Sequence, residues 1–435
     1  MFKVQEYMIE LAIILFLFVL INMFSQALQQ PISFNNGQGG DGVAYFKVAE
    51  QFANHRLPNA GAPFVYRIGT PLLVSLFFKS DLLLGFKIVN ITANLLTTLL
   101  FIFWLRLYLN NLKTRVLLST LFLVMWHGPV RYVYYYPAYS DPWFFVVLLT
   151  GLIGIQKTQV SPTVVRICVL GLVALVGVTF REASLVIPIA FLFSTNPVIQ
   201  SGGISYALAT FQVKRVIKSI PLIFFLPLGL GILGILIIFL TASQTNSYSF
   251  IHMAVYWAYG KPLLTYLHAW FIAFGPIIVI PIYNWRRMVR FMARNQFMLV
   301  YLLVFAVLGW IGGTDTDRIL FWAMPVVYIL IGQSIEDNAV LLKSLPLLII
   351  LCVGQLISER VIWTTPDYPG KFPSPLPILT IPSNRCQYLD LLSFHGSRKI
   401  HVVSFFEYLS LGMLLLWWLN YRAKKTEHMD TQCRT

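Results

Sequence analysis

Charged residues are scarce in this sequence. Asp, Glu, Lys and Arg together make up only 11% of the 435 residues, whereas soluble domains contain about 25%. Hydrophobic residues make up 57% of the chain and aromatic residues 15%. This composition excludes a cytosolic enzyme, a nucleic-acid-binding protein and a disordered scaffold, and it predicts an integral membrane protein.

Cysteine is also rare. The four cysteines lie far apart, so the sequence has no short spacing of the kind found in metal or redox motifs. Acidic residues are fewer than basic ones, 17 against 32, which gives a net charge of +15. In a membrane protein such an excess usually marks the cytoplasmic loops, so we expect no nucleic-acid partner.

Long apolar runs fill most of the remaining sequence. A helix needs about 20 mostly apolar residues to cross a membrane, and about ten to twelve runs approach this length. We therefore predict an all-α polytopic membrane protein with about 10–12 transmembrane helices in a single transmembrane domain over residues 1–435. The first run, Leu11–Met23, lacks a small-residue cleavage site and is interpreted as a membrane helix rather than a signal peptide.

Lys and Arg collect in alternate loops, and this asymmetry places the N-terminus and a tail at residues 420–435 in the cytoplasm. Two long loops then fall on the non-cytoplasmic side, at residues 29–70 and 358–401, and the second is rich in proline. Long loops are often lids or binding elements, with a passive connector as the alternative. The basic segment Trp285–Arg294 is interpreted as an anchor at the inner leaflet.

Ionisable residues beside membrane helices are candidates for function, because placing them there is costly. In the predicted topology a group of them lies at the outer ends of helices or in the outer loops: Asp41, Arg67, Asp141, Arg181, Glu182, Asp315, Asp317 and Arg318. Their common side predicts a shared outer cavity.

Asp41 is flanked by glycines and precedes an amphipathic stretch. The side chains of Tyr45, Val48, Ala49 and Phe52 fall on one face of a helix, which we expect to lie along the outer membrane surface. The Asp41 carboxylate is then either an N-cap that accepts backbone N–H groups or, because glycines allow a substrate to come close, an ionised general base. The residues alone leave both interpretations open.

Arg67 precedes Thr70 and Pro71, a pair typical of the start of a helix. An arginine there suits a phosphate, and a lipid headgroup or an ion pair with Asp41 fits equally well. Arg181 stands next to Glu182, so this pair can simply neutralise itself.

The segment from Arg131 to Trp143 contains five tyrosines, including Tyr135 and Tyr139. They are typical of an interfacial aromatic belt, and stacking on a sugar ring is the alternative. Asp141 follows them as an expected helix N-cap.

Asp315 and Asp317 lie in a short turn with Arg318. This turn can bind a divalent cation through carboxylate oxygens, hold a phosphate through the arginine, or be merely solvated. No other cofactor is indicated.

The segment Gly40-Asp41-Gly42 with Tyr45, followed by Pro63-Phe64-Val65-Tyr66-Arg67, resembles the first outer loop of the GT-C superfamily. These are integral-membrane glycosyltransferases, and the resemblance is to the group that uses polyprenyl-phosphate sugars. Arg181-Glu182 and Asp315 with Arg318 resemble acidic and basic pairs further along such chains. The resemblance implies interfacial helices in the first outer loop. The tryptophan-tryptophan-aspartate motif of oligosaccharyltransferases is absent from the sequence.

The resemblance also implies an inverting sugar transfer to a glycan, lipid or protein acceptor on the non-cytoplasmic face, with a bacterial inner membrane as the expected location. Asp41 would be the general base, and Arg67, Arg181 and Arg318 would bind the donor phosphate. The acceptor side would be supported by Asp141, Glu182, Asp315, Asp317, Tyr135 and Tyr139. The alternatives are an O-antigen-type polymerase or ligase that relies on late arginines such as Arg385, and a transporter or flippase of lipid-linked sugars.

Overall fold

The computed structural model describes residues 2–125, 128–194, 220–338, 345–358, 364–365, 367 and 398–432. Within these ranges the regular secondary structure is helical apart from one pair of short parallel strands, β1 (Asn59–Ala60) and β2 (Ser243–Gln244). Six helical segments are long and apolar enough to cross a membrane, or up to eight if each of two bent helix pairs counts as one span. The predicted all-α multi-pass membrane protein is therefore confirmed.

The six long segments are distributed along the whole chain. They comprise α1 (Phe2–Leu28), α4 (Leu82–Arg106), α5 (Leu112–Val124) together with α6 (Pro129–Tyr135), α7 (Asp141–Val160), η3 (Leu222–Phe225) together with α12 (Leu226–Thr241), and α23 (Arg398–Gln432). The last of these continues through most of the predicted cytoplasmic tail.

The described residues contain fewer spans than the 10–12 expected, because several apolar runs form short or broken helices. One chain bend of 104° separates α14 (Leu263–Phe274) from η4 (Pro276–Ile278) and α15 (Val279–Tyr283), at Gly275 with φ +69°. A second, of 112°, separates α16 (Trp285–Arg294) from α17 (Gln296–Ile311). Outside the first outer loop, the other described helices have fewer than 18 residues: α8 (Val164–Phe180), η2 (Glu182–Leu185), α9 (Val186–Ser194), α13 (Phe250–Gly260), α18 (Thr316–Phe321), α19 (Met324–Asp337) and α21 (Leu345–Ser358).

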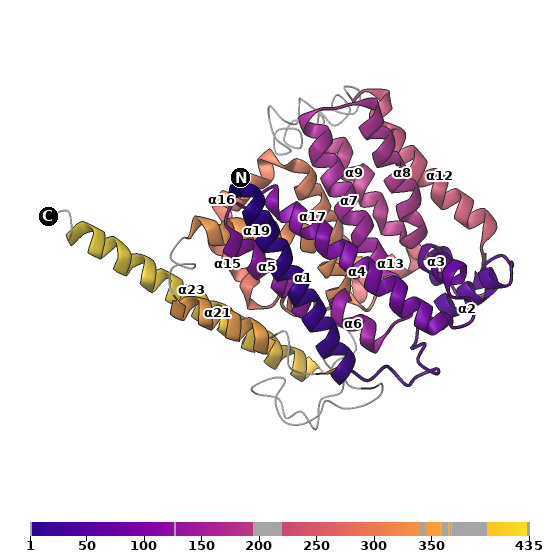
Figure 1. The fold of residues 1–435 in the computed structure, drawn as a ribbon, viewed down its shortest axis with the longest axis horizontal. Helices are drawn as coiled ribbons and strands as arrows, with labels where there is room; N and C mark the ends of the chain where they lie inside the picture. Colours follow the sequence, from indigo (N-terminus) through magenta and orange to yellow (C-terminus); the bar gives the residue numbers. More distant parts are fainter. Residues whose placement is uncertain are drawn as a thin grey trace.

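The core lies between α4, α7, α17 and α19, where large side chains such as Trp104, Phe144 and Tyr328 are fully or almost fully buried. The helices α8 and α12 lie side by side at the edge of this bundle (Figure 1). Their approach depends on small residues, since a Cβ added at Gly171 or Gly234 would lie 2.6 Å from a neighbouring leucine or valine side chain.

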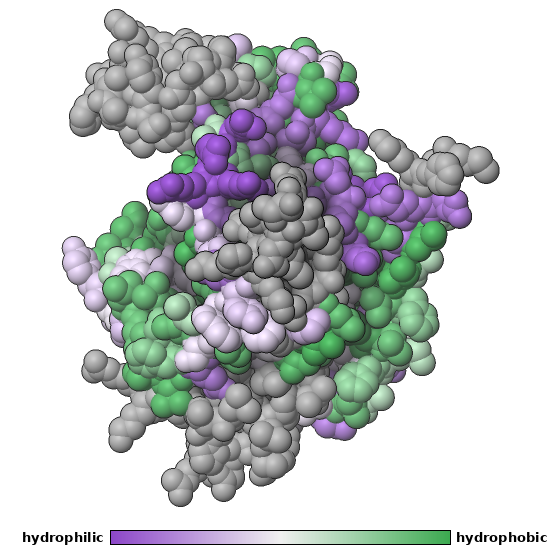
Figure 2. Space-filling model, turned by 90° about the vertical axis from the view of Figure 1, so that its left-hand side faces the viewer, coloured by the Kyte–Doolittle hydropathy of each residue, from purple (hydrophilic) through white to green (hydrophobic). Residues whose placement is uncertain are grey.

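Apolar side chains also cover much of the outer surface. Phe16, Val165 and Leu240 are among the most exposed, as expected for helices that face lipid. Figure 2 shows one face of the molecule, on which hydrophilic residues gather in the upper part and hydrophobic residues cover much of the area below them.

The first outer loop folds into two helices and a short turn: α2 (Gly42–Ala53), η1 (Phe64–Tyr66) and α3 (Gly69–Phe77). In α2 the predicted apolar face is confirmed, because Tyr45, Val48 and Ala49 are buried while Lys47 and Glu50 are exposed. These helices lie on the side of the molecule away from both termini (Figure 1). The strand pair β1–β2 ties this loop to the end of α12.

The predicted start of the next helix, with Thr70 as the N-cap and Pro71 as the first helical residue, is wrong by two residues. The helix α3 begins at Gly69 with Ile68 at its N-cap, and Thr70 is buried inside the first turn. A Cβ at position 69 would lie 2.6 Å from the Phe180 ring, so only a glycine allows the helix to begin this close to the end of α8.

The two predicted outer loops are in contact. The Gln29 side chain donates to the Thr365 carbonyl oxygen (2.8 Å) and accepts from the Thr365 N–H (2.7 Å), while the Ser33 N–H donates to Asp367 Oδ1 (2.8 Å). The other residues of the predicted loop 358–401 lie outside the described residues, except Thr364 and the two ends of the loop, where Ser358 ends α21 and α23 begins at Arg398. These contacts agree with the prediction that both loops lie on one side.

A buried ion-pair network joins α1 to α4 and α5 at the ends of these helices that lie away from the first outer loop. Arg115 Nε and Arg106 Nη1 lie 2.8 and 2.7 Å from the carboxylate oxygens of Glu10, whose side chain is 0% exposed. Arg115 also pairs with Glu6 at 2.7 Å. Such a network fixes the position of α1, because a buried carboxylate is tolerated only when it is paired.

We expect Arg115→Met to lower the free energy of unfolding by about 3 kcal/mol, since it leaves Glu10 buried with only Arg106 as its cationic partner. Thermal unfolding of the purified protein in detergent measures this effect. Lys113→Met, at an exposed position on the same helix, is the control and should change stability little. Equal effects of the two substitutions would contradict the assigned network.

Candidate functional site

Charged residues from four separate parts of the chain meet next to the first outer loop. Arg67 lies between η1 and α3, Asp141 is the first residue of α7, and Arg181 with Glu182 forms the turn from α8 into η2. Asp315 and Arg318 come from the start of α18. We call these six residues, each of which takes part in an ion pair, the charged cluster. Asp41 lies next to the cluster, within electrostatic range of Arg67, Arg181, Arg318 and Asp315.

Asp141 is the centre of the charged cluster. Its Oδ1 lies 2.5 Å from Arg181 Nη2 and its Oδ2 lies 3.4 Å from Arg318 Nε. Both partners of the shorter pair are almost completely buried, with side chains 4% exposed. The predicted N-cap role of Asp141 is wrong, because Ser140 occupies the N-cap and Asp141 follows it inside the helix, where its carboxylate pairs with the arginines.

Arg67 and Glu182 form a two-pronged ion pair, with Arg67 Nε and Nη2 donating to the two Glu182 oxygens at 3.0 and 2.6 Å. The third nitrogen, Nη1, donates to the Tyr45 hydroxyl at 3.2 Å. Burial lowers the pKa of Arg67, but Glu182 and Tyr45 raise this pKa by more, so the net shift is well above the ordinary value. Arg67 is therefore a permanent cation, and its partner is Glu182 rather than Asp41.

Asp41 differs from the other carboxylates near the cluster. It occupies the N-cap position of α2, but its side chain accepts no capping hydrogen bond. Among the described residues, no side chain or backbone group forms a hydrogen bond or ion pair with this half-buried carboxylate. Burial raises the pKa of Asp41, with Arg318 acting against this shift and Asp315 adding to it. The carboxyl group is thus a stronger base than an ordinary exposed aspartate.

The backbone around Asp41 is held by Tyr136, a residue that sequence reasoning did not single out. The Gly42 N–H donates to the Tyr136 hydroxyl oxygen at 2.5 Å. Gly39 has φ +73°, and a Cβ there would lie 2.0 Å from the Tyr136 ring. Gly39 and Gly42 therefore allow the protein's own backbone to come close to this tyrosine, whereas Gly40 lies in open space.

The predicted tyrosines, Tyr135 and Tyr139, are buried. They pack in a cluster with Tyr134, Tyr136 and Val133, and the Tyr139 hydroxyl donates to the Pro129 carbonyl oxygen at 2.8 Å. Their rings are therefore covered by protein. Two other tyrosines lie at the site: Tyr45 contacts Arg67, and Tyr136 contacts Gly42, the residue after Asp41. The sequence could not indicate these contacts, because the partners lie 22 and 94 positions apart.

The turn with Asp315 and Asp317 is held by Lys261. Its ammonium group donates to the carbonyl oxygens of Gly309 (2.7 Å) and Gly313 (2.8 Å) and to Thr316 Oγ1 (2.7 Å), and burial lowers the pKa of Lys261 to about 8. Asp315 pairs with Arg318 at 2.9 Å, whereas Asp317 is buried. In the described part of the chain no three His, Cys, Asp or Glu side chains are grouped to hold a metal ion.

The structure thus brings Arg67, Asp141, Arg181, Glu182, Asp315 and Arg318 into one cluster with Asp41 beside it, as expected of a shared site. Helix lengths and hydropathy define the chain as a helical multi-pass membrane protein. Comparisons with protein-family models, curated proteins and solved structures find no match.

We expect Gly39→Ala to lower the free energy of unfolding by about 1–3 kcal/mol, because the added methyl group strains the backbone and displaces Tyr136. Gly40→Ala is the matched control, since a Cβ at that position meets no atom within 4 Å. Thermal unfolding of the two variants in the same detergent makes the comparison. If the two variants were equally stable, the assigned packing of Tyr136 against Gly39 would be wrong.

Proposed function

We propose that this protein is a GT-C-type membrane glycosyltransferase. It transfers a sugar from a polyprenyl-phosphate donor to a hydroxyl of a glycan or lipid acceptor, on the non-cytoplasmic face of the membrane. The observation that carries the proposal is the carboxylate of Asp41, which is half-buried and lacks a hydrogen-bonding or ionic partner among the described residues, beside a cluster of three arginines. An uncommitted carboxylate of raised pKa is what a general base requires.

The reaction is a single displacement. The acceptor oxygen forms a bond to the anomeric carbon while the bond from that carbon to the phosphate oxygen breaks, and polyprenyl phosphate leaves with the electron pair. The acceptor proton passes to the Asp41 carboxylate. Because the attack comes from the face opposite the leaving group, the anomeric configuration inverts, and no covalent sugar–protein intermediate forms.

The three arginines have different tasks in this proposal. Arg67 and Arg181 are buried and committed to Glu182 and Asp141. Arg318 is more open, with a side chain 24% exposed, and its electrostatic effect on Asp41 is the strongest of the three. Arg318 is therefore the group that binds the donor phosphate and stabilises the leaving negative charge, while Arg67 and Arg181 hold the surrounding helices in place.

A transporter of lipid-linked sugars is less consistent with the arrangement. Transport pathways place polar residues near the middle of the membrane, whereas Asp141 and Glu182 stand at the first residues of helices and Arg67 lies in a loop. Arg385, one of the late arginines on which the polymerase or ligase alternative would rely, lies outside the described residues.

We expect Asp41→Asn to reduce sugar transfer by about 10²–10⁴-fold, because the amide cannot accept the acceptor proton. The measurement is the surface glycan profile of a strain that lacks the gene, complemented with each variant at matched membrane levels. Asp337→Asn is the control, since this aspartate pairs with Arg287 on another helix. A normal glycan in the Asp41→Asn strain would show that Asp41 is not the catalytic base.

We expect Arg318→Met to move the acid limb of the activity profile to higher pH. The base works only when ionised, so activity falls as the pH drops through the pKa of Asp41. Arg318 lowers that pKa, and its removal therefore raises the pKa. Residual transfer by purified enzyme across a pH series measures the shift, and Arg287→Met should leave the limb in place. If the acid limb were unchanged in Arg318→Met, Arg318 would not influence the pKa of Asp41.

A further inference from the structure

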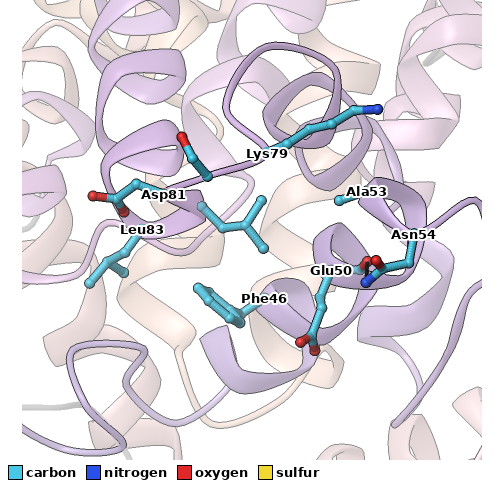
Figure 3. A pocket seen from close by; sticks show the side chains of 9 residues that line it. Phe46, Glu50, Ala53, Asn54, Lys79, Asp81 and Leu83 are labelled. Atoms are coloured by element: carbon cyan, nitrogen blue, oxygen red, sulfur yellow. Dashed lines mark hydrogen bonds between the residues drawn. The ribbon is translucent and has the colours of Figure 1, made fainter.

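Two surface features of the described residues lie outside the charged cluster, and they differ in how their charges are arranged. The first is a pocket of about 410 Å³ between the end of α2 and the segment that joins α3 to α4. Figure 3 shows its charged side chains, Glu50, Lys79 and Asp81, directed away from one another. The second is the helix α16, which gathers charges of one sign on one face and so presents them to a common ligand.

The helix α16 has one apolar face against the bundle and another that is exposed. Met288 and Met292 are buried, and the Met288 sulfur accepts a hydrogen bond from the Ser334 hydroxyl of α19 at 3.3 Å. On the next face, Trp285 and Val289 are 58% and 57% exposed. Exposed tryptophan is typical of the boundary between lipid headgroups and acyl chains. The helix therefore lies at the edge of the bundle, with an apolar side turned outward.

The third face of α16 is cationic. Arg286, Arg290 and Arg294 follow one another at intervals of four residues, which places their side chains in one row along the helix. All three are exposed, and none of them forms an ion pair with the described residues, whereas Arg287 beside the row pairs with Asp337 at 2.9 Å. The row thus offers three guanidinium groups, which bind phosphate oxygens through paired N–H groups.

The orientation of α16 is that of a helix lying along a membrane face. The chain bends by 112° between α16 and α17, so that with α17 across the membrane α16 lies roughly in its plane. The 16 residues of α17 rise about 24 Å and lead to the turn that carries Asp315 and Arg318. The helix α16 therefore lies at the membrane face opposite the charged cluster, and Figure 1 shows it on the other side of the molecule from α2 and α3.

The combination of faces limits the chemistry of the ligand. A soluble anion accounts for the arginine row but leaves Trp285 and Val289 exposed to water. An anionic phospholipid matches both features, since its phosphate meets the guanidinium groups while its acyl chains cover the apolar face. The helix has four arginines and no acidic residue, which adds attraction to an anionic leaflet.

We propose that α16 is a binding site for anionic phospholipids in the leaflet opposite the charged cluster. Arg286, Arg290 and Arg294 hold the headgroup phosphates, and Trp285 and Val289 lie among the upper parts of the acyl chains. The sequence predicted an anchor at this segment, whereas the arrangement of its side chains implies selection of anionic over zwitterionic headgroups. This binding does not depend on the proposed sugar transfer.

The test uses the full-length protein in phosphatidylcholine nanodiscs with a trace of photoreactive lipid, either phosphatidylglycerol or phosphatidylcholine, whose reactive group lies near the phosphate. Peptide mass spectrometry counts the crosslinks within residues 285–294. We expect the phosphatidylglycerol probe to exceed the phosphatidylcholine probe roughly fivefold or more. The preference should fall to near parity in Arg286→Gln/Arg290→Gln/Arg294→Gln, and Arg290→Gln alone should reduce it if the triple variant does not fold.

The matched control replaces three exposed cations of the first outer loop, Lys47, Arg56 and Lys79, by glutamine, which changes the net charge equally. This control should keep the preference at α16. An unchanged preference in the arginine variants, or equal crosslinking by the two probes in the wild type, would overturn the proposal. So would the absence of any lipid crosslink on α16, which would leave its arginines to a soluble anionic partner.

Discussion

The pairing of Arg181 with Asp141 is the interaction on which the rest of the site depends. Both side chains are 4% exposed, and a buried charge left without its partner would cost about 3–5 kcal/mol. The turn after α8 and the start of α7 must therefore meet, and Arg318 adds α18 to the same point. Arg67 and Glu182 then join the first outer loop to this centre.

This pairing also explains why one carboxylate differs from the others. Asp141, Glu182 and Asp315 are each held by an arginine, which fixes them in position. Asp41 lies within the field of the same arginines without a direct contact, and Tyr136 fixes its backbone through Gly42. A scaffold of mutually neutralised charges thus lies beside a carboxylate that remains free to exchange a proton.

The sequence predicted the helical membrane architecture, the amphipathic α2 and the charged residues of the site, because each depends on local hydropathy or on the cost of charge near a membrane. It could not predict which ions pair. Arg67 was equally compatible with Asp41 and with a phosphate, and its partnership with Glu182 depends on residues more than a hundred positions away. Within the described residues six to eight segments are long enough to span a membrane, and hydropathy does not register breaks such as the bend at Gly275.

The most direct test of the account is chemical modification of its carboxylates. A hydrophobic carbodiimide reacts with protonated carboxyl groups that lack an ionic partner, and mass spectrometry of the treated protein locates each modified residue. The account predicts that Asp41 is labelled, at a rate that falls as the pH rises through its raised pKa, while Asp141 and Glu182 are protected by their arginines. Labelling of Asp141 or Glu182 with Asp41 unmodified would contradict it.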